Sequence, residues 1–406
     1  MSILNKTAVP IIRHAAIEQP PKVDWTDFLQ DPSHRYNWIR NYDDKDYWFI
    51  EFANSYSFKF CLDSLLPLDI IEKIKNKEVT LILCNSQHGY HRIIEDIYNC
   101  VVMNYNIPPE QILLLSNSPD ILAEILFVSK EKNLDQIKAE FMIEFEAEAR
   151  EVAKSFTTAK NTLEYKEYPK KFLSFNGLPR PHRTAIQFLL KTNNLLRSGY
   201  VSYNARLQDN PTQDPVFHYT QLLCREELSI FFSSFEDDMC KLTPIYLDTT
   251  RDNHHLLHPS AVPITHIDFY QDSYFSIITE TAAYKGYSDE GFTGAGRILS
   301  EKTFKAIVNQ HPFILVAMPR SLEELHDLGY KTFSPWIDES YDQEEDDVKR
   351  TFMIMREVKK LCNLEPDELK EFLQFAKEIV VYNYNLLVSK NKWTYPLNYK
   401  WTYPLN

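Results

Sequence analysis

The fold is decided by a short run at residues 79–84, VTLILC, in this chain of 406 residues. A continuous, largely apolar run of this length predicts a strand covered on both faces, as in a parallel sheet. A polar loop, NSQHGYH, follows at residues 85–91. Beyond it, apolar residues return at helical spacing, at Ile93, Ile94, Ile97 and Val101. Strand, polar loop and helix in this order form one βα unit.

The same unit recurs along the chain. Further strands are predicted at 47–52, 111–115, 171–176, 275–279 and 312–316, and helices at 68–77, 182–193, 301–310 and 367–387. The charged residues 130–160 are predicted to be helical. The pattern indicates an α/β protein with two Rossmann-like domains in series and a long C-terminal helix.

The expected domains are an N-terminal α/β domain at 1–165 and a C-terminal α/β domain at 166–365. A helix at 366–390 is expected to pack back on the N-terminal domain. The tail at 391–406 holds KWTYPLN twice, at 392–398 and 400–406. Two copies are too few for a solenoid. The repeat is either a duplication without function or an aromatic docking tail.

Composition narrows the classes of function. The formal net charge of −13 disfavours nucleic acid as a partner, although it leaves room for a local basic groove. Only 8 glycines are present, so a phosphate site would depend on helix N-termini and cationic side chains. The six cysteines form no CxxC pair, and no run of 18 apolar residues exists. We therefore expect a soluble, cytoplasmic protein with no membrane partner.

The first candidate site is SFNGLPRPHR at residues 174–183, where a strand runs into a loop with Arg180 and Arg183. Ligands of open α/β sheets bind beyond the carboxyl ends of strands. The planar guanidinium suits phosphate oxygens, which favours a diphosphate as the ligand. The alternative is a pair of surface arginines at a helix start, although the helix dipole disfavours cations there.

The second candidate site joins Glu280, directly after the strand at 275–279, to SEKTFK at residues 300–305. Ser300 is a suitable N-cap, so Glu301 and Lys302 fall in the first helical turn. A carboxylate there can accept hydrogen bonds from ribose hydroxyls. Lys302 and Lys305 share a helix face and can neutralise phosphate charge. The alternative is an ordinary capped surface helix.

Together these segments resemble the α1,3-fucosyltransferase group of GT-B glycosyltransferases. The resemblance covers about residues 171–350 and rests on a strand ending in Ser-x-Asn before arginines, a strand ending in Glu, and Ser-Glu-Lys opening a helix before HPF. The chain also resembles uncharacterised phage and large-virus glycosyltransferase-like proteins that carry SEKTFK, HPF, DLGYKTF and DESYD. A viral source would place the protein in the host cytoplasm.

The resemblance implies a GT-B architecture, with two domains facing a central cleft and a nucleotide sugar as co-substrate. It implies that Asn176, Arg180 and Arg183 approach the diphosphate and that Glu280 lies near the transferring sugar. Glu301 would hold the ribose and Lys302 would approach phosphate. The family's acceptor-side signatures are missing, so the resemblance fixes neither fucose nor GDP.

The loop at 85–91 supplies candidates for the general base of an inverting transferase, His88 and His91, since histidine titrates near neutral pH. They are otherwise loop histidines with local hydrogen bonds. No histidine or carboxylate cluster has a recognised metal-ligand spacing, so neither a metal nor a resident cofactor is expected.

We therefore expect a metal-independent, inverting glycosyltransferase that moves a sugar from a nucleotide sugar to an acceptor hydroxyl. The acceptor, a glycan, a protein or a modified nucleobase, stays open. The alternatives are a non-catalytic binding protein on the same fold and a phage-type DNA-base glycosyltransferase.

Overall fold

The computed structural model describes residues 46–51, 66–85, 93–141, 143–155, 166–176, 180–203, 267–284 and 297–390. The chain divides into two compact units, each with its own parallel sheet. Unit 1 comprises residues 1–144 and 391–406, and unit 2 comprises residues 145–390. The mixed α/β, Rossmann-like class expected from the sequence is confirmed.

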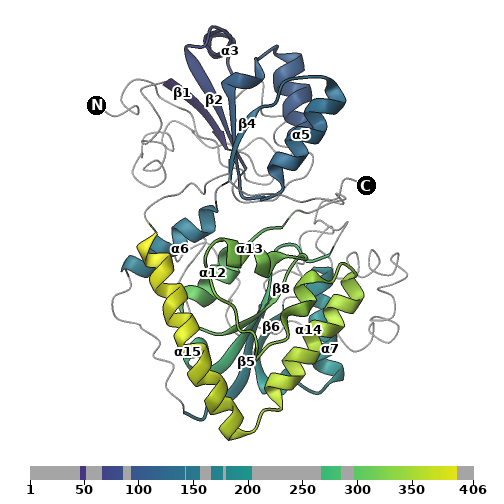
Figure 1. The fold of residues 1–406 in the computed structure, drawn as a ribbon, viewed down its shortest axis with the longest axis vertical. Helices are drawn as coiled ribbons and strands as arrows, with labels where there is room; N and C mark the ends of the chain where they lie inside the picture. Colours follow the sequence, from purple (N-terminus) through teal and green to yellow (C-terminus); the bar gives the residue numbers. More distant parts are fainter. Residues whose placement is uncertain are drawn as a thin grey trace, which may run out of the picture. The chain divides into compact units, whose positions relative to one another are not determined.

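Unit 1 contains a four-stranded parallel sheet in the order β1-β2-β3-β4 (Figure 1). The strands are β1 (Asp46–Glu51), β2 (Val79–Asn85), β3 (Ile112–Ser116) and β4 (Lys138–Phe141). The helices between them are α3 (Leu68–Lys75), α4 (Ile93–Asp96) with its π-helical continuation η3 (Ile97–Asn104), and α5 (Ile121–Lys132). Each strand pairs with the one before it in the chain, on the same side of the sheet. The strand order of unit 1 therefore does not reverse.

The core of unit 1 lies between one face of this sheet and its helices. Alternate strand residues such as Leu81, Leu83 and Leu114 pack in one buried cluster with Ile70 of α3 and Ile97 of η3. Apolar side chains at helical spacing after β2 thus supply the helical half of this core.

Unit 2 contains a second four-stranded parallel sheet, in the order β6-β5-β7-β8. The strands are β5 (Lys170–Asn176), β6 (Gly199–Tyr203), β7 (Ser273–Thr279) and β8 (Phe313–Val316). From β5 the chain passes through α7 (Pro181–Thr192) to β6 on one side. From β7 it passes through α12 (Glu301–Val308) to β8 on the other side. The strand order therefore reverses between β5 and β7.

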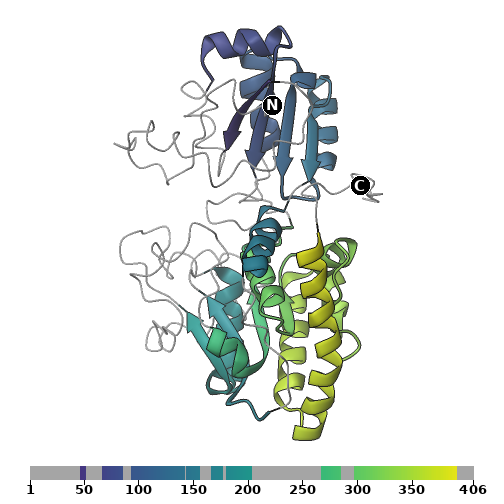
Figure 2. The same cartoon turned by 90° about the vertical axis from the view of Figure 1, so that its left-hand side faces the viewer.

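The remaining helices of unit 2 are α6 (Glu144–Ser155), α11 (Ile267–Gln271), α13 (Ser321–Asp327), α14 (Asp347–Cys362) and α15 (Pro366–Ser389). Figure 2 shows α14 and α15 on the same side of the sheet. α14 contacts β5 and β8, and α15 contacts α12.

Some expected elements and boundaries differ from the structure. Residues 130–160 are not one helix, because β4 lies between α5 and α6. The division falls at residue 144 instead of 165, and it groups the long helix at 366–390 with unit 2. β4 is a strand because it pairs with β3 through backbone hydrogen bonds. This pairing does not depend on side-chain type, so it forms although two of the four residues of β4 are charged. The duplicated tail lies outside the described residues.

Candidate functional site

The site is built at the point where the strand order of unit 2 reverses. β5 and β7 are neighbours, and their chains leave toward opposite sides of the sheet. Ligands of open α/β sheets bind in the crevice outside the carboxyl ends of such a strand pair. Asn176 ends β5 and Thr279 ends β7. Thr279 Oγ1 donates a hydrogen bond of 2.5 Å to Asn176 Oδ1, which ties the two strand ends together.

Asn176 is engaged within the protein. Only 1 % of its surface is exposed. Its Nδ2 donates to Ser174 Oγ at 3.2 Å, and its backbone N–H donates to Ser202 Oγ at 3.2 Å. The side chain predicted to approach the diphosphate therefore holds β5 to β7, and the backbone N–H of the same residue holds β5 to β6.

The first turn of α7 holds the end of β7. Arg180 Nη1 donates to the carbonyl oxygen of Thr281, and Arg183 Nη2 donates to that of Glu280 at 3.2 Å. His182 Nε2 lies 2.8 Å from the same Glu280 carbonyl, and since that oxygen only accepts, Nε2 carries the proton. Arg183 and His182 are buried, whereas Arg180 is half-buried. Of the two arginines, Arg180 is the one that reaches solvent.

The cations of this region lie close together, since Arg180 donates to the Thr281 carbonyl and Lys302 Nζ lies 3.4 Å from Thr281 Oγ1. Burial lowers the pKa of His182 well below its usual value, and the positive charges of Arg183, Arg180 and Lys302 lower it further. The hydrogen bond to the Glu280 carbonyl opposes that shift. The imidazole is therefore neutral at neutral pH, and the nearby positive charge is carried by the arginines and Lys302.

Glu280 caps the beginning of α12 from a neighbouring strand. Its carboxylate is fully buried. It accepts from the Ser300 N–H at 3.0 Å, from the Ser300 hydroxyl, from Thr303 Oγ1 at 2.5 Å and from the Thr281 N–H at 3.2 Å. Both carboxylate oxygens thus have partners within the protein. This geometry makes Glu280 a positioning residue, whereas the resemblance implied that it lies near the transferring sugar.

Glu301 and Lys302 form an ion pair at the start of α12. Lys302 Nζ lies 2.6 Å from Glu301 Oε1, 3.0 Å from Ser300 Oγ and 3.4 Å from Thr281 Oγ1. The side chain of Lys302 is 25 % exposed and that of Glu301 is 23 % exposed, so both can contact a ligand. Burial raises the pKa of Glu301, but the charges of Lys302 and Lys305 outweigh it and lower that pKa to about 2.

The structure brings the predicted residues of unit 2 to one place, and burial divides them into two groups. Asn176, Arg183 and Glu280 are buried and brace the strand ends and helix starts. The residues that reach solvent are Arg180, Thr281, Glu301, Lys302 and Lys305. This second group presents cations, a hydroxyl and a carboxylate, which together suit a phosphate group attached to a hydroxyl-bearing moiety.

Sequence reasoning missed Thr281, Thr303 and His182. His182 lay inside the quoted arginine motif, and Thr281 and Thr303 each lay one residue from a predicted one. Only the fold shows that the Thr303 hydroxyl reaches the carboxylate of Glu280. The predicted bases His88 and His91 lie outside the described residues.

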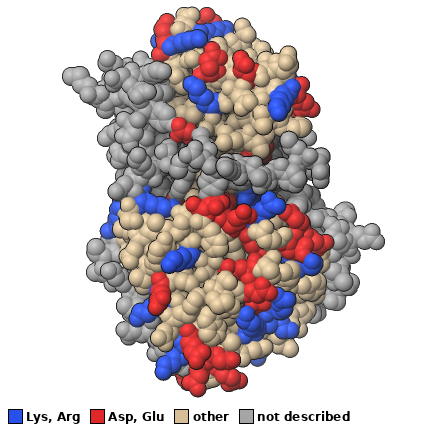
Figure 3. All heavy atoms as spheres, viewed as in Figure 1, with Lys and Arg blue, Asp and Glu red and all other residues tan. Residues whose placement is uncertain are grey.

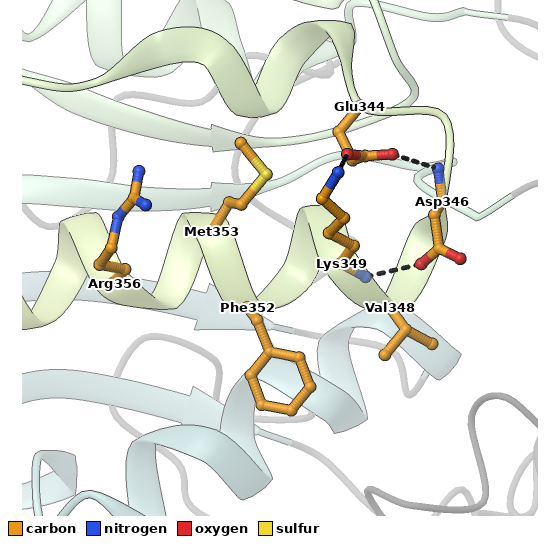
Figure 4. A pocket seen from close by; sticks show the side chains of 7 residues that line it. All are labelled: Glu344, Asp346, Val348, Lys349, Phe352, Met353 and Arg356. Atoms are coloured by element: carbon orange, nitrogen blue, oxygen red, sulfur yellow. Dashed lines mark hydrogen bonds and ion pairs between the residues drawn. The ribbon is translucent and has the colours of Figure 1, made fainter.

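A hollow of about 720 Å³ lies along α14 and shares no residue with this site. Figure 4 shows its lining, in which Lys349 pairs with Glu344 beside the apolar side chains of Val348, Phe352 and Met353. On the face drawn in Figure 3, the described Lys and Arg side chains alternate with Asp and Glu and form no continuous basic stripe. That face does not favour a nucleic-acid backbone.

The described residues contain no cluster of three or more His, Cys, Asp or Glu side chains arranged to hold a metal ion. Within the same ranges, no helix combines the length and the apolar character needed to cross a lipid bilayer.

Comparisons with known proteins add little to this geometry. No family model matches the chain, and no curated protein matches it. Among solved structures, the N-terminal domain of trehalose-6-phosphate phosphatase from Candida albicans is similar, with a TM-score of 0.37 and 11 % identity. That match covers 86 % of this chain and 69 % of the other.

Proposed function

We propose that the protein is a glycosyltransferase that moves a sugar from a nucleotide sugar to an acceptor hydroxyl. Unit 2 binds the donor at the carboxyl ends of β5 and β7. Unit 1 contributes the acceptor side, as in a GT-B enzyme. The observation that carries the proposal is the meeting of Arg180, Glu301 and Lys302 at the strand-order reversal, where Arg180 and Lys302 both hydrogen-bond to Thr281.

The roles follow from which atoms reach solvent. Lys302 and Arg180 bind the diphosphate and stabilise the negative charge that develops on it as the sugar leaves. Lys305, on the same helix face, adds long-range attraction. Glu301 is ionised at neutral pH and accepts hydrogen bonds from ribose hydroxyls.

The buried residues position the residues that reach solvent. Glu280 anchors Ser300, whose hydroxyl lies 3.0 Å from Lys302 Nζ, so the position of the lysine depends on the buried carboxylate. Arg183 and His182 hold the Glu280 carbonyl and so tie the start of α7 to the end of β7. On this proposal, side-chain cations do the work that a divalent ion does in metal-dependent transferases. The transfer is inverting, with a base from unit 1 taking the acceptor proton.

One specific observation favours a second candidate, a non-catalytic binding protein. The acid at the end of β7, Glu280, has both oxygens engaged and none turned to solvent. A protein that only binds a nucleotide needs the phosphate and ribose contacts but no acid beside the sugar. Release of nucleoside diphosphate from a nucleotide sugar distinguishes the two candidates.

The test is a thermal-shift panel of UDP, GDP, CDP, ADP and TDP and their common sugar derivatives, in EDTA. The proposal predicts a rise in the melting temperature with at least one of them, and loss of that rise in Lys302→Ala. Lys349→Ala is the matched control, since Lys349 also pairs with a carboxylate at the start of a helix in unit 2. Absence of any shift across the panel would contradict the proposal.

A further inference from the structure

Two side chains at the carboxyl end of β3, in unit 1, have buried polar atoms that nothing satisfies. Asn117 is 1 % exposed and Ser118 is 6 % exposed. Within the described part of the chain, Nδ2 and Oδ1 of Asn117 and Oγ of Ser118 have no hydrogen-bond partner. Buried polar atoms in native proteins are nearly always paired, because an unpaired one loses its water without compensation.

Neighbouring polar groups of unit 1 do have partners. Ser116 Oγ accepts from the Ser118 N–H at 3.1 Å. Tyr98 donates to the Asp135 carbonyl at 2.9 Å and accepts from the Ile137 N–H at 3.1 Å. These buried polar groups of unit 1 are thus satisfied, whereas among the described residues the Asn117 amide and the Ser118 hydroxyl are not.

The position of these atoms favours a ligand. Asn117 and Ser118 follow β3 directly and precede α5, a helix of 12 residues. The carboxyl end of a parallel strand, before a helix, is the usual place for a ligand in an α/β unit. Glu140, paired in register with Leu115, has another unpartnered oxygen at the same end of the sheet.

The chemistry of the pair indicates an uncharged ligand. The amide of Asn117 offers donors and an acceptor, and the hydroxyl of Ser118 can act as either. The loop, Ser116-Asn117-Ser118-Pro119-Asp120, contains no cation and ends in an acid, so it does not suit phosphate or carboxylate. Groups that donate and accept at adjacent atoms, as sugar hydroxyls do, can satisfy it.

We infer that Asn117 and Ser118 form a second ligand site, which binds the hydroxyl groups of a neutral saccharide. That this saccharide is the acceptor rests on the proposed function. The binding site itself rests only on the unpaired atoms and their position. It differs from the donor site in chemistry, since the donor site is cationic and the loop of this one contains no cation.

The test is saturation-transfer NMR of the full chain with a mixture of glucose, galactose, mannose and N-acetylglucosamine. We expect saturation transfer to at least one sugar in the wild type, loss of it in Asn117→Leu and weakening in Ser118→Ala. Ser129→Ala is the control, because its hydroxyl donates to the Leu126 carbonyl at 3.2 Å in the same unit. It should leave the sugar signal unchanged.

Stability separates a ligand site from an internal hydrogen bond. Asn117→Leu removes both unpaired atoms but adds volume, whereas Ser118→Ala removes an unpaired hydroxyl and adds none, so Ser118→Ala should keep or raise the urea midpoint. A lower midpoint in Ser118→Ala would show that its hydroxyl is bonded within the protein and would overturn the inference. Absence of saturation transfer in the wild type, or an equal signal in Asn117→Leu, would also overturn it. If Asn117→Leu does not fold, Ser118→Ala decides by the same two measurements.

The nucleotide panel, run on the same preparation, separates the two proposals. A nucleotide shift without an Asn117-dependent sugar signal would refute this site alone. An Asn117-dependent sugar signal without any nucleotide shift would refute the proposed function and leave the saccharide site standing.

Discussion

The carboxylate of Glu280 accepts hydrogen bonds from both the backbone N–H and the hydroxyl of Ser300, twenty residues later in the chain. This contact joins the end of β7 to the first turn of α12. It places Lys302 beside the end of β7, where its Nζ lies 3.4 Å from Thr281 Oγ1. The position of Lys302 in the site thus depends on the carboxylate of Glu280, which does not itself reach solvent.

Glu280→Gln should destabilise the protein and weaken nucleotide binding together. An amide retains one oxygen, so its NH₂ group must face hydroxyl or N–H donors of Ser300 and Thr303. We expect a loss of about 2–4 kcal/mol in the free energy of unfolding, measured by urea denaturation. Glu323→Gln, at an exposed position on α13, is the control. Unchanged stability in Glu280→Gln would show that the buried carboxylate is dispensable.

Glu301→Gln should separate ribose recognition from phosphate recognition. If Glu301 accepts from ribose hydroxyls, the variant should bind a nucleoside diphosphate about tenfold more weakly, a loss near 1.4 kcal/mol. Its affinity for inorganic pyrophosphate should stay equal or rise, because a negative charge beside Lys302 has been removed. Isothermal titration with both probes measures this difference. Equal losses for the two probes would exclude a ribose contact.

His311 should make stability fall in acid. It is buried, its Nε2 donates to the Ser273 carbonyl at 2.9 Å, and its Nδ1 accepts from Ser276 Oγ at 2.8 Å. Burial lowers its pKa to about 4, against the hydrogen bond to Ser273. As the pH falls, His311 therefore takes up its proton at a higher pH in the unfolded chain than in the folded protein. The stabilisation is complete above pH ~6.5 and is lost as the pH falls toward 4, by up to about 3 kcal/mol.

Urea denaturation of the wild type and of His311→Gln across this pH range measures the effect. The variant should be less stable at neutral pH. Its free energy of unfolding should also change less with pH between about 4 and 6.5 than that of the wild type. A slope identical to that of the wild type would assign the acid sensitivity to other groups.

Gly199→Ala should destabilise unit 2 through a clash. Gly199 begins β6, and a Cβ atom there would lie 2.3 Å from Cε2 of the buried ring of Phe172. Its φ of −121° suits any residue, so the cost is steric. We expect the free energy of unfolding to fall by about 2–3 kcal/mol, measured by urea denaturation. Adding Phe172→Leu should recover part of this loss. A fully stable Gly199→Ala variant would contradict the packing.

Much of the fold was predictable because buried parallel strands are apolar runs. β2, β3, β5, β7 and β8 were each predicted within two residues of their ends. β4 was missed because two of its four residues are charged and an edge strand needs only one buried face. The pairing of β5 with β7 was out of reach, since periodicity carries no information about which strands are neighbours.

The candidate site was predictable in its residue types and only partly in their roles. Strand ends and helix starts indicated Arg180, Glu280 and Lys302. Spacing along the chain could not show that the Glu280 carboxylate faces inward, because its partners Ser300 and Thr303 come from an element twenty residues away. Burial separates bracing residues from ligand-facing ones, and burial is a property of the packed fold.

The central claim is that Lys302 binds the diphosphate of a nucleotide at the end of β7. Its most direct test is isothermal titration in EDTA, with the nucleoside diphosphate that gives the largest thermal shift. We predict that Lys302→Ala raises the Kd at least about tenfold, a loss near 1.4 kcal/mol, while Lys349→Ala leaves it unchanged. Equal Kd values for the wild type and Lys302→Ala, or no binding of any nucleoside diphosphate to the wild type, would contradict the claim.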